Sequence, residues 1–113
     1  MLVIVFRSKL TPAAGEDYNW WSEEMNTLAR QNPGFVDVRS YLAADGERLT
    51  LVWWRDEESL QQWSRHVRHL EAKKIGRAKW YEYYKMDVAQ IIRVSEFSRQ
   101  GESHTQSATV SAD

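Results

Sequence analysis

Residues 32–60, NPGFVDVRSYLAADGERLTLVWWRDEESL, decide the fold. The opening Asn-Pro-Gly ends a preceding helix, and Phe35–Leu42 and Arg48–Trp54 then carry the β-branched and aromatic residues typical of strands. The Asp-Gly pair at 45–46 is a strong signal for a hairpin turn between these strands. Asp56 follows as a helix N-cap, with glutamates in the first turn. The stretch therefore predicts a β-hairpin that leads into a helix.

The residues before this hairpin predict one strand and one helix. Leu2–Ser8 is apolar on both faces, as expected of a central strand. Thr11-Pro12 marks a helix start or a turn, and the following helix ends at about Gln31. Its apolar face, spaced by three and four residues, consists of Tyr18, Trp21, Met25 and Leu28.

The residues after the hairpin predict a second helix and a last strand. The helical face consists of Leu60, Trp63, Val67 and Leu70. We expect helical structure to continue, after a kink, to about Lys79, and a long strand to cover Tyr83–Phe97. The whole order is β-α-β-β-α-β, which is the α+β, ferredoxin-like arrangement of four antiparallel strands with two helices on one face.

The sheet is predicted to be apolar on both faces. Adjacent strand residues point to opposite faces, yet Ile4 and Val5 are both apolar, as are Ile91 and Ile92. A bare apolar sheet would expose a larger patch than soluble monomers usually show. We therefore expect a homodimer that packs two sheets face to face, with the long last strand reaching the partner.

Composition excludes several classes of protein. The chain has 113 residues, a net charge of −1 and no cysteine, so a single domain without disulfides or thiolate metal sites is expected. The charge gives no basic field for nucleic acid, and no apolar run could span a membrane or act as a leader. We predict a cytoplasmic protein with a domain at residues 1–97 and a flexible tail at residues 98–113.

Several motifs together suggest a family. They are Asn32-Pro33-Gly34-Phe35, the run from Trp53 to Leu60 that leads to Trp63, and then His69, Ala72, Gly76-Arg77, Trp80-Tyr81 and Tyr84. With the predicted element order, residues 1–97 resemble the antibiotic-biosynthesis monooxygenase family of dimeric α/β barrels. The resemblance implies two protomers, each with a cavity between helices and sheet. Characterised members oxidise polycyclic phenols with O₂ and no cofactor, or degrade haem.

The haem-degrading branch of that family matches poorly. Trp63 is similar to its helix-two tryptophan, but Lys73 stands where the branch has a haem-ligating histidine. The branch also uses an asparagine in its first strand, and Leu2–Ser8 contains none. Haem degradation is therefore the less favoured expectation.

Cofactor-free oxygenation of an activated phenol or anthrone requires a dry aromatic pocket, a proton acceptor and a group that stabilises an oxyanion. By chemical type, His69 is the predicted base, and Arg77 or the hydroxyl of Tyr84 is the predicted partner of a phenolate. The predicted substrate-binding residues are Trp53, Trp63, Trp80 and Tyr81. No metal and no cofactor are expected, since His66 and His69 have no obvious third ligand.

The same residues also allow structural roles. Trp63 falls on the core stripe, and His69 could be a structural histidine. Trp53 and Trp54 must face opposite ways, one toward the helices and the other toward the partner. A dimer interface, in which tyrosine is enriched, would use Tyr81, Tyr83 and Tyr84.

One helix is strongly basic. Six cations lie within fifteen residues, namely Arg65, Arg68, Lys73, Lys74, Arg77 and Lys79. A solvated helix face is the default interpretation, and an acidic ligand is the alternative. The aromatic residues among these charges are too sparse for an RNA-stacking platform.

Two functions remain open from the sequence. The first is a monooxygenase that oxidises a small aromatic or quinol-like molecule. The second is a non-catalytic dimer that binds an apolar metabolite, because the fold alone does not fix the function.

Overall fold

The computed structural model describes residues 1–99. Its elements are β1 (Leu2–Leu10), α1 (Glu16–Arg30), β2 (Phe35–Leu42), β3 (Arg48–Trp54), α2 (Glu57–Ser64), α3 (Val67–Ile75), the π-helical turn η1 (Gly76–Trp80) and β4 (Tyr81–Gln90). This order confirms the ferredoxin-like α+β prediction.

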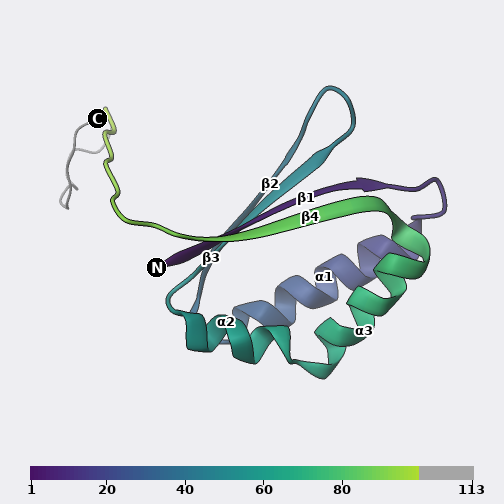
Figure 1. Cartoon of the computed structure of the whole chain (residues 1–113), viewed down its shortest axis with the longest axis horizontal. Coiled ribbons are helices and arrows are strands. Elements are labelled where there is room, and N and C mark those ends of the chain that lie inside the picture. Colours follow the sequence, from purple (N-terminus) through teal and green to yellow (C-terminus); the bar gives the residue numbers. More distant parts are fainter. Residues whose placement is uncertain (100–113) are drawn as a thin grey trace.

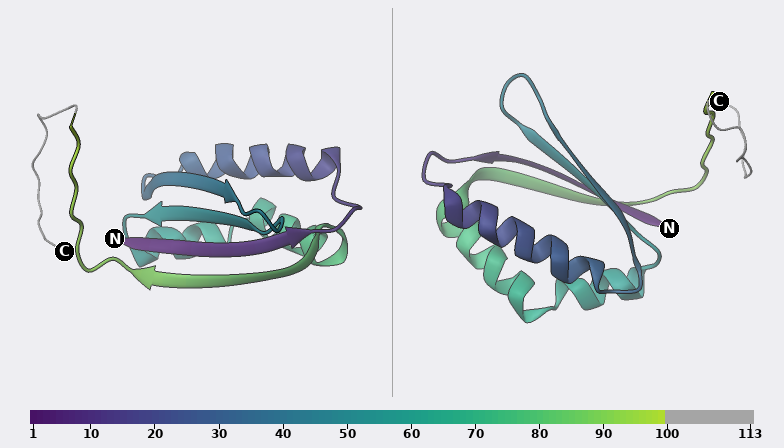
Figure 2. Two further views of the ribbon diagram at one scale, coloured as in Figure 1. Left: turned by 90° about the horizontal axis from the view of Figure 1, so that it is seen from above. Right: turned by 180° about the vertical axis from the view of Figure 1, so that it is seen from behind.

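The four strands form one antiparallel sheet in the order β2-β3-β1-β4. Leu2 of the central strand β1 pairs with Trp54 of β3 on one side and with Gln90 of β4 on the other. All helices lie on one face of this sheet (Figures 1 and 2). The other face, called here the helix-free face, carries no helix within residues 1–99.

The turns and caps around the hairpin follow the sequence prediction. Gly46 has a φ of 93°, which favours glycine in the β2–β3 turn. Asp56 caps α2, since its Oδ1 accepts the N–H of Ser59 at 2.8 Å. The Asn-Pro-Gly turn packs directly on the start of α2, because a Cβ on Gly34 would overlap the Ser59 side chain. The two motifs therefore fix the hairpin to the helix layer.

The core lies between the helices and the middle of the sheet. Trp54 is fully buried there, with its ring stacked 6.4 Å from that of Trp63 and edge-on to Phe35 at 5.8 Å. Its Nε1–H has no acceptor within residues 1–99, which costs about 1–3 kcal/mol for a buried donor. The other buried members of this core are Ile4, Ala29 and Leu60.

The second helical segment differs from the predicted stripe. The helix breaks after Ser64, and His66 caps α3 by accepting the Arg68 N–H on Nδ1 at 3.1 Å. After this break, α3 turns a different side toward the core than the apolar spacing predicts. Ala72 is therefore buried, while Val67 and Leu70 are 67% and 49% exposed. The prediction of Val67 and Leu70 as core residues is therefore wrong.

No helix in the described part of the chain is long and apolar enough to cross a membrane.

The first helix begins later than its leading proline. Residues 11–15 form a turn in which Ala14 N–H donates to the Thr11 carbonyl at 3.0 Å, and α1 starts at Glu16. Thr11-Pro12 therefore belongs to a turn, which was one of its two predicted roles.

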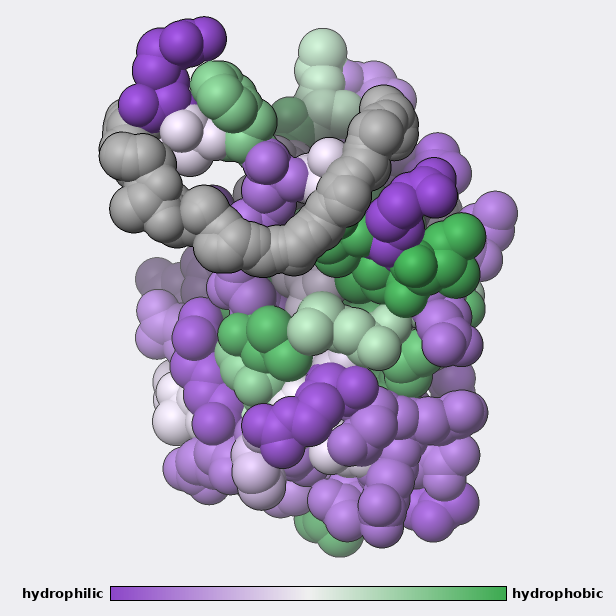
Figure 3. Space-filling model, turned by 90° about the vertical axis from the view of Figure 1, so that its left-hand side faces the viewer, coloured by the Kyte–Doolittle hydropathy of each residue, from purple (hydrophilic) through white to green (hydrophobic). Residues whose placement is uncertain are grey.

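The last strand is shorter than predicted, since β4 ends at Gln90 rather than Phe97. Gln90 pairs with Leu2, and Ile91 N–H donates to Met1 O at 3.0 Å, so β1 offers no further partner. Beyond it, Ile92, Val94 and Phe97 are 88%, 52% and 80% exposed. The view from this end shows hydrophobic residues on the surface among hydrophilic ones (Figure 3). Most of the predicted tail, residues 100–113, lies outside the described residues.

Candidate functional site

A hydrogen bond joins the helix layer to the last strand. Arg77 Nε donates to the Tyr84 hydroxyl at 2.8 Å, and both side chains are exposed to solvent. Arg77 lies in the π-helical turn η1, a rare element that often occurs at functional sites. The pair places a permanent positive charge beside a phenol hydroxyl, where a bound molecule can reach both groups.

A glycine allows η1 to pack closely on β4. A Cβ on Gly76 would lie 2.7 Å from Cε2 of Tyr81, closer than such atoms approach. Gly76 itself has an ordinary helical φ of −59°, so the close approach and not the backbone angle requires glycine. Gly76 therefore helps to place Arg77 over the beginning of β4.

Aromatic rings surround Tyr84. Its ring stacks on Phe6 with centroids 5.5 Å apart, and Tyr81 meets both rings edge-on at 5.6 and 5.8 Å. Burial raises the pKa of the Tyr81 hydroxyl, so this group stays protonated at neutral pH and can donate a hydrogen bond.

The strip of β4 that continues from Tyr84 is apolar and uncovered. Tyr84, Met86 and Val88 alternate along the strand, opposite Ser8, Phe6 and Ile4 of β1, and therefore face the helix side. Their exposed fractions of 36%, 50% and 51% show that the helices leave this strip open. The strip could form the apolar wall of a ligand site.

His69 and Trp63 form a second group at the α2–α3 junction. The imidazole stacks on the indole with centroids 4.6 Å apart, and Nδ1 lies 3.2 Å from the Trp63 carbonyl oxygen. Burial, helped by the nearby positive charge of Lys73, lowers the pKa of His69 to about 4. A carbonyl only accepts, so Nδ1 carries the hydrogen and Nε2 keeps the free lone pair.

Trp80 does not line an open site. It is 3% exposed, and its Nε1–H donates at 3.1 Å to Oδ2 of Asp17, which also accepts from Lys79 Nζ at 2.9 Å. These hydrogen bonds lower the pKa of Asp17 to about 2. Trp80 therefore ties η1 to the start of α1, and its predicted contact with substrate stays a prediction.

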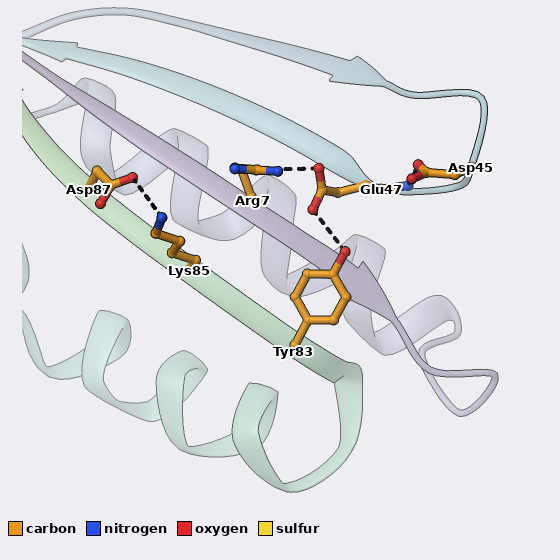
Figure 4. Close-up of polar contacts among 6 residues, drawn as sticks. All are labelled: Arg7, Asp45, Glu47, Tyr83, Lys85 and Asp87. Atoms are coloured by element: carbon orange, nitrogen blue, oxygen red, sulfur yellow. Dashed lines mark hydrogen bonds and ion pairs between the residues drawn. The ribbon is translucent and has the colours of Figure 1, made fainter.

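Trp53 lies apart from the other candidates. It pairs with Val3 on the helix-free face, whereas its neighbour Trp54 is buried under the helices. One end of that face is polar, because Glu47 accepts from Arg7 at 3.3 Å and from the Tyr83 hydroxyl at 2.8 Å (Figure 4). The structure thus places Trp53 on the opposite face of the sheet from Tyr84. Within residues 1–99, no hydrogen bond or ring contact joins His69 to Arg77 or Tyr84, so the predicted site residues fall into separate groups.

An open pocket of about 590 Å³ adjoins Arg77. Its lining residues are Leu70, Lys73, Lys74, Arg77 and Ala78. The sequence predicts a solvated basic helix face for these two lysines, with an acidic ligand as the alternative, and does not place them in the site. Their spacing of three and four residues from Leu70 and Arg77 is the signal that places them on one face.

The histidines do not form a metal centre with their neighbours. His66 Nδ1 accepts the Arg68 N–H, and His69 Nδ1 is directed to the Trp63 carbonyl. Among residues 1–99, no three side chains of the metal-binding types gather at one point.

Two curated proteins are similar in sequence. The protein YqjZ of Bacillus subtilis, described as uncharacterized, is 38% identical over 76 residues, which cover 67% of each chain. The jasmonate monooxygenase ABM of Pyricularia oryzae is 28% identical over 104 residues, which cover 88% of this chain and 48% of the relative. The chain therefore spans about half the length of the second relative.

A solved structure and a family model give the fold and the family. SnoaB, a cofactor-independent oxygenase of Streptomyces nogalater, superimposes with a TM-score of 0.66 at 13% identity, over 88% of this chain and 97% of SnoaB. The sequence model of the antibiotic biosynthesis monooxygenase family matches residues 1–75. The matched range includes Trp63 and His69 and ends before Arg77. By this match, the chain belongs to the antibiotic biosynthesis monooxygenase family.

Proposed function

We propose that the protein is a monooxygenase that oxidises a small aromatic or quinol-like molecule with O₂ and without a bound cofactor. The observation that carries this proposal is the hydrogen bond from Arg77 to Tyr84 beside the open apolar strip of β4. An electron-rich ring would lie on the strip, and its oxyanion would be stabilised by the guanidinium and the phenol hydroxyl.

The reaction balances without an external reductant. When a CH₂ group of an anthrone becomes a carbonyl, one oxygen atom enters the substrate and the other leaves as water with both hydrogens. The substrate supplies all the electrons once it has lost a proton. The protein therefore has to remove that proton, stabilise the anion and exclude water.

His69 is the proposed proton acceptor. Its lowered pKa of about 4 keeps the ring neutral at pH 7, with Nε2 free. The same lowered pKa makes His69 a weak base, so it fits a substrate whose proton is already acidic. Trp63, stacked on His69, would form the aromatic wall at this end of the site.

The relatives support the reaction type. One is named a jasmonate monooxygenase and one a cofactor-independent oxygenase. The family match covers His69 and Trp63, while Arg77, Tyr81 and Tyr84 lie beyond it and enter the proposal on their geometry.

We further propose that the protein acts as a homodimer packed through the helix-free face. Apolar residues of two neighbouring strands are only partly covered there, namely Val3, Val5, Leu49, Leu51 and Trp53. The exposed apolar residues of segment 91–97 would then contact the partner. Trp53 would be an interface residue in this assembly.

The function is tested by O₂ uptake with anthrones, naphthoquinols and catechols. Wild type is compared with His69→Ala and Arg77→Gln, and with Arg65→Gln as a control for an exposed cation outside the site. We expect uptake above autoxidation, at least about tenfold lower in both site variants and unchanged in the control. Quenching of tryptophan fluorescence by these compounds without uptake would instead support the binding protein. A Soret shift on adding hemin would support haem binding.

A further inference from the structure

We propose that the substrate of this site carries an acidic group, and that Lys73 and Lys74 bind that group in the open pocket beside Arg77. The inference rests on the proposed function for the location of the substrate. Its test measures binding alone, so a protein that binds acids but consumes no O₂ would separate the two proposals.

Two of the six cations of the basic segment have acidic partners in the structure, and four have none within residues 1–99, namely Arg65 outside the pocket and Lys73, Lys74 and Arg77 in it. Arg68 is neutralised by Glu24 at 3.1 Å and by Glu71 at 3.5 Å, and Lys79 is neutralised by Asp17 at 2.9 Å. Lys73 and Lys74 form no ion pair with any of residues 1–99. The structure therefore leaves uncompensated those lysines that line the pocket.

Three positive charges consequently share one pocket. Lys73, Lys74 and Arg77 lie within one turn of each other and line a space of about 590 Å³. The single polar side-chain contact that Arg77 makes in the described chain is to the uncharged Tyr84 hydroxyl. Like charges on one helix face repel each other, and an anion bound among them relieves that repulsion.

The apolar surroundings specify the rest of the ligand. Arg77 connects the pocket to the open strip of Tyr84, Met86 and Val88, which extends about 13 Å along β4. Leu70 adds an exposed apolar side chain at the other end of the pocket. The ligand class is therefore an amphipathic acid, with its charged end at the lysines and its apolar body on β4.

Binding of the acid would also affect the proposed base. Lys73 contributes to the low pKa of His69 through its charge. An anion paired with Lys73 offsets that charge, which raises the basicity of His69 when the substrate is present. Substrate without the acidic group would lack this effect.

The test uses two fluorescent dyes that differ by one charge. Anilinonaphthalene sulfonate carries the acidic group, and N-phenylnaphthylamine is its neutral counterpart. Both are titrated into wild type, Lys73→Gln, Lys74→Gln and the control Arg65→Gln. We expect each lysine variant to weaken binding of the sulfonate about threefold and to leave binding of the neutral dye unchanged. Arg65→Gln should bind both dyes as wild type does.

Competition then identifies the acidic group. Naphthoate, naphthyl phosphate and methyl naphthoate are added to the complex of wild type with the sulfonate dye. Displacement by naphthoate or by naphthyl phosphate, but not by the ester, supports the proposal and distinguishes a carboxylate from a phosphate. Equal weakening of both dyes by the lysine variants, equal weakening by Arg65→Gln, or displacement by the ester would overturn it.

Discussion

The imidazole of His69 lies nearly parallel to the indole of Trp63, with ring centroids 4.6 Å apart and planes inclined by 13°. Its Nδ1 also meets the Trp63 carbonyl at 3.2 Å, so one side chain contacts both the ring and the backbone of the residue near the end of α2. The histidine thus holds α3 against α2 across the break in the helix, and it does so in its neutral form.

This relationship predicts a pH-dependent stability. Burial lowers the pKa of His69 from 6.5 to about 4, so between these values the unfolded chain binds more protons than the folded one. The free energy of unfolding is therefore highest above pH 6.5 and falls, by up to about 3 kcal/mol, as the pH decreases toward 4. His69→Phe keeps an aromatic ring without the titrating group and should lose less stability over this range.

Urea unfolding at pH 7 and pH 4.5, followed by tryptophan fluorescence, measures this difference. The relevant quantity is the loss for wild type minus the loss for His69→Phe, because other groups titrate in both proteins. Equal losses would show that His69 does not become protonated on unfolding as proposed.

The elements that could be predicted from the sequence are those fixed by local chemistry. The Asp-Gly turn at 45–46 and the cap at Asp56 need only neighbouring residues, and both appear in the structure. A kink in this helical segment is predicted from the sequence, but its position is not, because Val67 and Leu70 continue the apolar spacing and His66 is not a common cap. The end of β4 depends on where the distant strand β1 begins.

In the candidate site, too, the sequence indicates the chemical type of a residue but not its contacts with distant elements. His69, Arg77 and Tyr84 are candidates by chemical type alone, and in the structure a hydrogen bond joins Arg77 to Tyr84. The sequence alone cannot show that the indole N–H of Trp80 is hydrogen-bonded within the protein, because its acceptor, Asp17, lies 63 residues away in the sequence. Nor can sequence spacing tell whether Lys73 and Lys74 have acidic partners on other elements.

The close approach at Gly76 predicts a strong effect of a single methyl group. In Gly76→Ala, the new Cβ would lie 2.7 Å from the Tyr81 ring, so η1 and β4 must separate. We expect a loss of about 1–3 kcal/mol in the free energy of unfolding. Gly15→Ala is the control, since nothing lies within 4 Å of its Cβ. Chemical denaturation of both variants checks the prediction, which fails if the two substitutions have equal effects.

The Tyr84 hydroxyl should matter for turnover more than for binding. Tyr84→Phe keeps the ring stacked on Phe6 but removes the group that accepts from Arg77. If this hydroxyl stabilises the oxyanion, kcat for O₂ uptake falls at least about tenfold while KM changes little. Tyr83→Phe is a matched control on the opposite face, where the hydroxyl contacts Glu47. Similar kinetics for both variants would remove Tyr84 from the mechanism.

The Asp17 contacts predict an acid-sensitive attachment of η1 to α1. Hydrogen bonds from Lys79 and Trp80 lower the pKa of Asp17 from 3.8 to about 2. The contribution of this carboxylate to stability is therefore full above pH 4 and is lost as the pH falls toward 2. Asp17→Asn should lower Tm at pH 7, and its deficit relative to wild type should shrink at pH 3. Glu16→Gln removes a charge at the same helix end without these hydrogen bonds, and should lower Tm at pH 7 less than Asp17→Asn does.

The proposed dimer predicts that one charge in the centre of the helix-free face separates the chains. Leu51 pairs with Val5 on one side and with Arg39 on the other, so Leu51→Lys would place an ammonium group inside the packed sheets. Light scattering at micromolar concentration should give twice 13.3 kDa for wild type and 13.3 kDa for this variant. Val67→Lys alters an apolar side chain that is 67% exposed on α3 and should remain a dimer. Packing through this face would be contradicted if the wild-type protein had the mass of one chain. It would also be contradicted if Val67→Lys dissociated to the same extent as Leu51→Lys. Unchanged circular dichroism of Leu51→Lys would show that the loss of mass comes from the interface, because Leu51 lies on the side of the sheet that the helices do not cover.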